Sequence, residues 1–342
     1  MDKKIDEILK KYPLMPLSLK IELLKDFGIY VKREDIKDYK PTMKDNYDVL
    51  EKRVFESLDK SNIDMINKTL RQIKEPMITS GVGGSFVVSN FASKVLSKKN
   101  NIISQNTTLR DINYLNLDGY KNILVCSYGG MNYGVENAFK CNLNKYLLSR
   151  NEIDGINNIK YYADLEKSFI SLSSTLIPIT ILLQYYLDGD IKLIKEILND
   201  RSTIDIKNAN NIEVLSGHET STAHSFLEST FVESGMANIT IHDKYDYCHG
   251  RSNLNYKLNN NNILLFNNKT ELDMLYLNEL KNYYENVYVI DKKYEDDIVN
   301  DYYLTYKCML LCEKIANDKD IDLSNFKYSP FVKKLYFFKG EM

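Results

Sequence analysis

The sequence predicts an α/β fold of two doubly wound parallel sheets behind a helical N-terminal lead-in. From about residue 76 onward, short apolar runs alternate with helical segments. Glycine-rich turns follow two of these runs, and a second series of runs and helices begins after a polar stretch near residue 200. Strands and helices that alternate with short connections are typical of parallel, doubly wound sheets.

The length of 342 residues accommodates two domains or one large α/β unit. Residues 1–75 carry apolar stripes at helical spacing and no glycine-rich or catalytic cluster, so we expect a helical segment that packs on the first domain or on a partner. The polar segment 188–209 joins the two series. We therefore predict a first domain over 76–200 and a second over 201–342.

The first series is expected to contain five strands and three helices. The predicted strands cover 77–79, 102–103, 123–126, 146–148 and 160–162. The predicted helices cover 85–96, 132–139 and 175–187.

The second series repeats this architecture without detectable repetition of residues. Its predicted strands cover 212–215, 239–241, 263–266 and 287–290. Its predicted helices cover 222–233, 271–284 and 297–317.

Composition excludes several classes of function. A net charge of −2 provides no basic footprint for nucleic acid. The charged N-terminus lacks the apolar core of a secretory signal, and the longest apolar stretch, near 176–187, is too short to span a membrane. Five scattered cysteines without a Cys-x-x-Cys pair predict a reducing, cytoplasmic environment, with Cys308 and Cys312 as core residues of one helix.

The first glycine turn, Gly81-Val82-Gly83-Gly84-Ser85, lies between a predicted strand and a predicted helix. Such a turn lets the backbone approach a ligand, and the free N–H groups of the helix attract a phosphate. Phe86 occupies the place of the third glycine of a dinucleotide fingerprint, and no lysine completes a P-loop. A turn built only for tight packing is the alternative.

The second turn, Ser127-Tyr128-Gly129-Gly130-Met131-Asn132, follows the next clear strand, where ligands of open α/β sheets collect. Ser127 and Asn132 supply neutral polar contacts, although Asn132 could also be only a helix cap. Ser173-Ser174-Thr175 precedes an apolar helix, where capping and ligand binding are both consistent with the residues.

All four histidines lie between 218 and 249. A metal site of His218, His224 and His242 is one interpretation, but their spacing fits no single helix face. His249 precedes Gly250 in a segment typical of a ligand-facing loop. Glu233 ends a mostly apolar helix, where a raised pKa would suit a general base, and a solvent-exposed helix end is the alternative.

Taken together, these segments resemble the double-SIS (sugar isomerase) family of phosphosugar isomerases, deaminases and deglycases, over about residues 76–325. Gly81, Gly83 and Ser85 match the first loop of the family. Ser127 and Gly130 match its second loop, and Ser174-Thr175 match its third segment. The spacing of Glu233 and His249, 249 − 233 = 16, matches the isomerase half of glucosamine-6-phosphate synthase.

The resemblance implies a flavodoxin-like SIS fold and substrate contacts from the matched loops and from four further positions, Gly84, Gly129, Asn132 and Arg251. The predicted substrate-binding residues are Gly83, Gly84, Ser85, Ser127, Gly129, Gly130, Asn132, Ser174, Thr175 and Arg251. By the same resemblance Glu233 shuttles a proton between C1 and C2 of the sugar, and His249 assists ring opening. A homodimer with the site completed between subunits is the implied assembly.

The chain also departs from the family pattern. Gly129 and Asn132 replace a serine and a threonine of the second loop, and Leu176 replaces a lysine. Arg251, which replaces a proline, offers a charge from another direction. The phosphosugar is therefore expected to be unusual, or its anionic group to be bound elsewhere.

Two functions remain open on the same fold. The first is a cytoplasmic enzyme of carbohydrate-derivative metabolism that needs no metal or organic cofactor and isomerises, deaminates or deglycates a sugar phosphate. The second is a protein that binds a sugar phosphate without turnover, as a sensor. A nucleotide-binding α/β protein is a weaker third interpretation, because the third glycine is missing.

Overall fold

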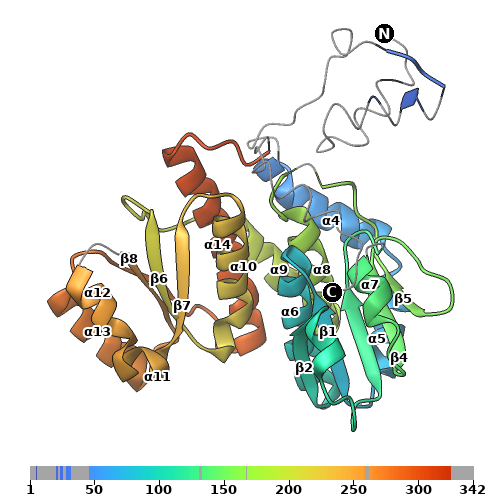
Figure 1. Cartoon of the computed structure of the whole chain (residues 1–342), viewed down its shortest axis with the longest axis horizontal. Helices are drawn as coiled ribbons and strands as arrows, with labels where there is room; N and C mark the ends of the chain where they lie inside the picture. The colour runs from blue at the N-terminus through green and yellow to red at the C-terminus, as the bar shows by residue number, and fades with distance from the viewer. Residues whose placement is uncertain are drawn as a thin grey trace.

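The computed structural model of the chain describes residues 46–130, 133–166, 168–258 and 262–324. Of the first 45 residues it describes 5, 21, 24, 25 and 28–31. The predicted fold class is confirmed, because the described residues form two all-parallel sheets flanked by helices. Figure 1 shows the two sheets on either side of a central layer of helices.

The first sheet has the strand order β2-β1-β3-β4-β5. Its strands are β1 (Met77–Gly81), β2 (Ser104–Thr108), β3 (Asn122–Cys126), β4 (Asn144–Ser149) and β5 (Asn157–Lys160). The chain runs from β1 out to β2 and returns past β1 to β3. The strand order therefore reverses between β1 and β3, and the crevice beyond their carboxyl ends is where such sheets bind ligands.

Two predicted strands of this sheet were misplaced. The strand expected at 102–103 is β2, and the strand expected at 160–162 is β5, which ends at Lys160. Ile103 is instead 69% exposed. Both strands lie at edges of the sheet and are largely polar, so apolar runs are a poor guide to their position.

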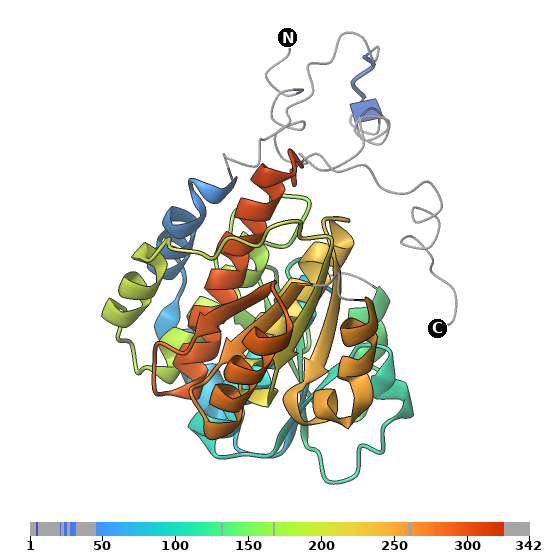
Figure 2. The same ribbon diagram turned by 90° about the vertical axis from the view of Figure 1, so that its left-hand side faces the viewer.

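The second sheet has the order β7-β6-β8-β9, which is the order of the first sheet without its fifth strand. Its strands are β6 (Asn211–Ser216), β7 (Asn238–Asp243), β8 (Asn262–Asn267) and β9 (Val287–Asp291). Helix α13 (Glu271–Tyr283) packs on the outer face of this sheet through Leu280, next to Leu215 and Leu265 (Figures 1 and 2).

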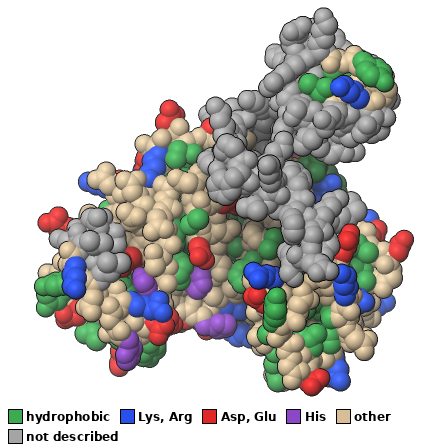
Figure 3. All heavy atoms as spheres, in the orientation of Figure 1, with side chains coloured by type: hydrophobic (Ala, Val, Ile, Leu, Met, Phe, Trp, Pro, Cys, Tyr) green, Lys and Arg blue, Asp and Glu red, His purple; other side chains and the backbone are tan. Residues whose placement is uncertain are grey.

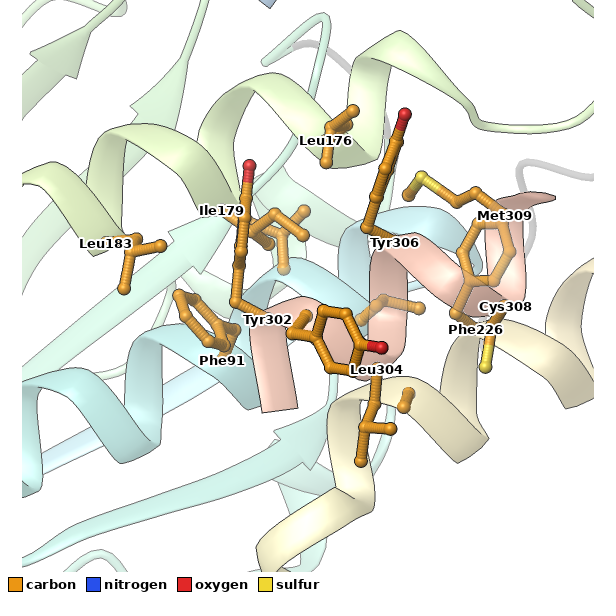
Figure 4. Close-up of a cluster of buried hydrophobic side chains, with 14 of the residues drawn as sticks. Phe91, Leu176, Ile179, Leu183, Phe226, Tyr302, Leu304, Tyr306, Cys308 and Met309 are labelled. Atoms are coloured by element: carbon orange, nitrogen blue, oxygen red, sulfur yellow. The ribbon is translucent and has the colours of Figure 1, made fainter. Parts of the chain in front are cut away.

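Helices of both units meet in the middle of the molecule. The helices of this layer are α6 (Gly84–Asn100), α8 (Ser173–Tyr186), α10 (Ser221–Glu233) and α14 (Asp297–Asp318). Their buried side chains, among them Phe91, Ile179, Phe226 and Tyr302, belong to one hydrophobic cluster (Figure 4). Burial of this apolar surface is the main force that holds the two sheets together.

Helix α8 is buried almost along its whole length, which explains its uniformly apolar sequence. Within the described residues, no helix combines the length and the apolar character needed to cross a bilayer. Cys308 and Cys312 are fully buried on α14, so their predicted place in the core of one helix is confirmed.

The remaining helices cover the outside of the two units. They are α4 (Leu50–Lys60), α5 (Ile63–Gln72), α7 (Tyr133–Ala138), α9 (Lys192–Asn199), α11 (Lys244–Asp246) and α12 (Ser252–Leu258). Helix α9 lies in the segment that the sequence predicted only as a polar connection. Its Ile194, Ile197 and Leu198 are buried, so the segment is an amphipathic helix.

A buried ion pair crosses between the two units. Lys94 of α6 forms an ion pair with Asp301 of α14, and both side chains are almost fully buried. The Asp301 carboxylate also accepts hydrogen bonds from the backbone N–H groups of Thr222 and Ala223, at 3.3 and 3.2 Å. One carboxylate therefore fixes the start of α10 and the position of α6 together.

Candidate functional site

The first glycine loop forms a tight turn between β1 and α6. Gly83 has φ +56°, a conformation that favours glycine, and it precedes the first residue of α6. A Cβ on Gly84 would lie 2.3 Å from the Cβ of Ser171 and 2.9 Å from Oγ1 of Thr175. Glycine is therefore required here for packing against the start of α8, as the packing alternative predicted, whether or not the loop also binds a ligand.

Ser85 lies in the first turn of α6 and is half-buried. Its hydroxyl makes no hydrogen bond to any residue that the structure describes, so both its donor and its acceptor positions are open to a ligand.

A hydrogen bond within the second loop joins its serine to its second glycine. Ser127 is buried, and its Oγ accepts a hydrogen bond of 3.1 Å from the backbone N–H of Gly130. The serine proton is still available for a further acceptor. The carbonyl oxygen of Gly129 accepts a hydrogen bond of 2.8 Å from the side chain of Asn151. Asn132, the last predicted contact of this loop, lies outside the described residues.

The start of α8 is occupied by a carboxylate of the chain itself. Oε2 of Glu166 accepts hydrogen bonds from the N–H and hydroxyl of Ser174, at 2.9 and 3.0 Å, and from the hydroxyl of Ser173 at 3.0 Å. Arg53 lies 3.6 Å from the other carboxylate oxygen. Glu166 thereby occupies one N–H group and two hydroxyl groups at the helix start that could otherwise bind a phosphate, and the sequence analysis did not predict this role.

Thr175 is fully buried beneath the first loop. Its Oγ1 has no hydrogen-bond partner among the described residues. The predicted contacts Ser174 and Thr175 are thus placed under the loops, where they support α8, and neither lines the pocket described next.

A pocket of about 440 Å³ lies between the two units. The first unit contributes the glycine loop and the end of β2, and the second contributes the last three turns of α10. The lining residues are Gly81, Val82, Gly83, Phe86, Thr108, Ser225, Glu228, Ser229, Val232 and Glu233. We call this space the interdomain pocket. Of the predicted site residues, it brings Gly83 and Glu233 together.

Glu233 is the last residue of α10 and is exposed, as the alternative of a solvent-exposed helix end predicted, and it also lines the pocket. The apolar surroundings raise the pKa of its carboxyl group above the ordinary value of 4.5, because they disfavour the charged form. Glu228 lies on the same wall, and no lysine or arginine lines the pocket among the residues that the structure describes. The pocket is therefore suited to proton transfer, while any phosphate must be held by neutral groups and backbone N–H donors.

His249 lies in a kinked turn, Tyr247–Arg251, that follows β7 and α11. Gly250 has φ +102° at the kink, and the His249 side chain is exposed. Arg251 is also exposed and lies 3.7 Å from Asp246. Neither residue lines the interdomain pocket, so a single copy of the chain does not bring them to Glu233.

The turn that carries His249 is anchored from below. Tyr247 is buried, and its hydroxyl donates a hydrogen bond of 3.2 Å to Glu213 of β6. Asn255 of α12 donates to the same hydroxyl at 3.5 Å. The buried His242 lies 3.8 Å from Glu213. The backbone next to His249 is therefore held in place, while the imidazole points outward.

Two of the three histidines considered as metal ligands have other partners, and the third, His218, is exposed. Nδ1 of His224 lies 2.7 Å from Oγ of Ser216, and burial lowers its pKa to about 4. His242 lies beside Glu213. Figure 3 shows histidine side chains spread over the lobe of the second sheet. In the described part of the chain, no three metal-binding side chains come together.

The fold is similar to solved structures of proteins named for sugar phosphates. A proposed phosphosugar isomerase from Clostridium difficile 630 is 18% identical, with 86% of this chain and 98% of that chain covered and a TM-score of 0.66. Tagatose-6-phosphate ketose/aldose isomerase from Escherichia coli is 14% identical, with 84% and 96% covered and a TM-score of 0.60.

The C-terminal domain of glucosamine-fructose-6-phosphate aminotransferase from Francisella tularensis is 14% identical, with 86% and 99% covered and a TM-score of 0.59. No protein-family model matches the sequence, and neither does any curated protein. The structural likeness shows the fold, and at that level the resemblance drawn from the sequence motifs is confirmed.

Proposed function

We propose that the chain is an enzyme of the phosphosugar isomerase, deaminase or deglycase type. The observation that supports this most directly is the interdomain pocket, in which Glu233 faces the first glycine loop. A raised carboxyl pKa makes Glu233 a stronger base than an ordinary glutamate. The names of the similar structures, which include a tagatose-6-phosphate isomerase, are consistent with a sugar phosphate as substrate.

In the proposed reaction the phosphate is held at the amino end of α6 by Gly83, Gly84 and Ser85, beside Ser127 and the Gly129-Gly130 turn. These positions lie beyond the carboxyl ends of β1 and β3, where the strand order reverses. The sugar carbons then extend toward α10. Glu233 removes the proton from C2 of the open-chain sugar, which leaves an enediolate with its charge on O1. A proton then passes from the O2 hydroxyl to O1, and Glu233 returns its proton to C1, which gives the ketose.

His249 is proposed to open the sugar ring from a second copy of the chain. It is exposed and held on an anchored turn, and it does not line the interdomain pocket of its own chain. A homodimer that presents His249 to the neighbouring pocket completes the site. Arg251, two residues further on and also exposed, would bring a positive charge to the same place.

A sensor that binds a sugar phosphate without turnover is the second candidate. The absence of lysine and arginine from the interdomain pocket and the carboxylate of Glu166 at the start of α8 favour it. Both features weaken the electrostatic attraction of an anion to the site. If the chain is an enzyme, the backbone N–H groups of the glycine loops must therefore bind the phosphate in place of a cationic side chain.

A screen of hexose 6-phosphates and amino-hexose 6-phosphates separates the two candidates. A ligand at 100 times its Kd adds about 2.7 kcal/mol to the free energy of unfolding, which a thermal shift detects. For the enzyme we also expect loss of the C2–H signal in deuterated water, followed by proton NMR. Stabilisation without exchange would support the sensor, and no stabilisation by any member would contradict both.

The pH dependence of exchange follows from the pKa of Glu233. A general base acts in its ionised form, so the exchange rate at saturating sugar phosphate should fall as the pH drops through the pKa of Glu233. Because that pKa is raised, the midpoint of the acid limb should lie above 4.5. Kd is measured over the same pH range, because protonation of the phosphate changes Kd, whereas protonation of the base changes the exchange rate at saturating ligand. A midpoint at or below 4.5 would contradict the assignment.

A further inference from the structure

A second pocket lies at the carboxyl edge of the first sheet, away from the interdomain pocket. It has a volume of about 560 Å³, within the range of small-molecule sites. The chain segments after β4 and β5 form one side, and the turn between α4 and α5 forms the other. We call this space the β4–β5 pocket.

The charges of the two pockets are opposite in sign. Lys60, Arg150 and Lys160 line the β4–β5 pocket, and Glu152 is the one acidic residue on its wall. Within the described part of the chain, the interdomain pocket carries Glu228 and Glu233 and no cationic side chain. By charge alone the β4–β5 pocket therefore attracts an anionic small molecule more strongly, while a phosphate in the interdomain pocket relies on the backbone N–H groups of the glycine loops.

Two of the cations are held on aromatic rings. Nζ of Lys60 lies 4.7 Å from the ring centre of Tyr162, and Cζ of Arg150 lies 5.5 Å from that of Tyr128. The Tyr162 hydroxyl donates a hydrogen bond of 2.8 Å to Asp164, which fixes its ring. Such contacts orient a cation without neutralising it.

Lys160 forms an ion pair of 2.7 Å with Glu152, but Lys60 and Arg150 form no ion pair with any residue that the structure describes. Arg150 is further tied down by a hydrogen bond of 3.4 Å from its guanidinium to the carbonyl oxygen of Ala163. Two oriented cations thus face the pocket before any ligand arrives, which reduces the entropy that binding costs.

We propose that the β4–β5 pocket binds a small molecule through a phosphate or carboxylate group, at a site separate from the interdomain pocket. Lys60 and Arg150 hold the anionic group, and the exposed ring of Tyr162 and the side chain of Met65 offer apolar contact to the rest of the ligand. Asn151 joins this wall to the second glycine loop by its hydrogen bond to Gly129.

The test counts phosphate sites per chain by calorimetric titration of inorganic phosphate at low salt, and repeats the titration with glucose 6-phosphate and with glucose. The double variant Lys60→Glu, Arg150→Gln changes the two cations that are proposed to hold the anion. Lys60 is exposed and Arg150 is half-buried, so the fold should be retained. Lys121→Glu is the control. Lys121 is exposed and directly precedes β3, at the amino ends of the strands, whereas the β4–β5 pocket lies at their carboxyl ends.

The double variant is expected to lose one phosphate site per chain, or to raise its Kd at least tenfold, while Lys121→Glu retains it. This difference between the variants does not depend on the proposed function. If phosphate also binds at the glycine loops, that site is present in the wild type and in every variant, and if it does not bind there, the site is absent from all of them. The proposal is overturned if the double variant binds as the wild type does, if Lys121→Glu loses the site equally, or if glucose binds it as well as glucose 6-phosphate.

Discussion

Glu233→Gln is expected to reduce proton exchange at C2 by about 10²- to 10⁴-fold, the usual contribution of a general base. The amide has nearly the same size as the carboxylate and cannot accept the proton, so Kd for the sugar phosphate should change by only a few-fold. Exchange is measured by proton NMR in deuterated water, and Kd by calorimetry on the same samples.

Glu228→Gln is the matched comparison, because it removes the other carboxylate from the same wall of the same helix. We expect its exchange rate to stay within about tenfold of the wild type, since its loss alters only the charge around the base. If Glu228→Gln loses exchange and Glu233→Gln retains it, the base is Glu228, and the alignment of Glu233 with His249 is coincidental.

Lys94→Met is expected to lower the free energy of unfolding by about 3–5 kcal/mol, the typical cost of removing one partner from a buried ion pair. Asp301 is fully buried and would lose its cationic partner, while still bound to the first N–H groups of α10. The same carboxylate joins α6, α10 and α14, so the loss should loosen the contact between the two units.

The matched control is Lys98→Met, one turn further along α6. Lys98 lies 3.2 Å from Asp296, but both side chains are substantially exposed. Exposed pairs contribute about 0–1 kcal/mol, so the free energy of unfolding should change little. Guanidinium unfolding followed by tyrosine fluorescence suits a chain with 26 tyrosines and no tryptophan. Equal losses for the two variants would contradict the role given to the Lys94–Asp301 pair.

The buried parts of the fold could be predicted because their residues leave a continuous apolar signal. Strands β3 and β8 are buried at every position and were placed within one residue. No residue of the edge strand β2 is fully buried, and β5 buries only Ile159, so apolar runs placed both strands wrongly. Helix α9 was missed because the segment that contains it was judged by its polar residues, although its apolar ones share one face.

The site was predictable only where a motif is local in sequence. The two glycine loops and Glu233 stand out because each is marked by its own neighbours in the chain. Glu166 reaches Ser174 across an irregular segment, and Lys94 meets Asp301 across 207 positions. No sequence pattern records such contacts, since only folding brings the residues together.

A crystal structure of the Glu233→Gln variant with a bound hexose 6-phosphate tests the central claim most directly. We predict that the phosphate lies against Gly83–Ser85 and the Ser127–Gly130 turn, with C1 and C2 within about 3–3.5 Å of the side chain at position 233, the separation that reaction requires. A sugar phosphate found only in the β4–β5 pocket, or one whose C1 and C2 point away from α10, would contradict it.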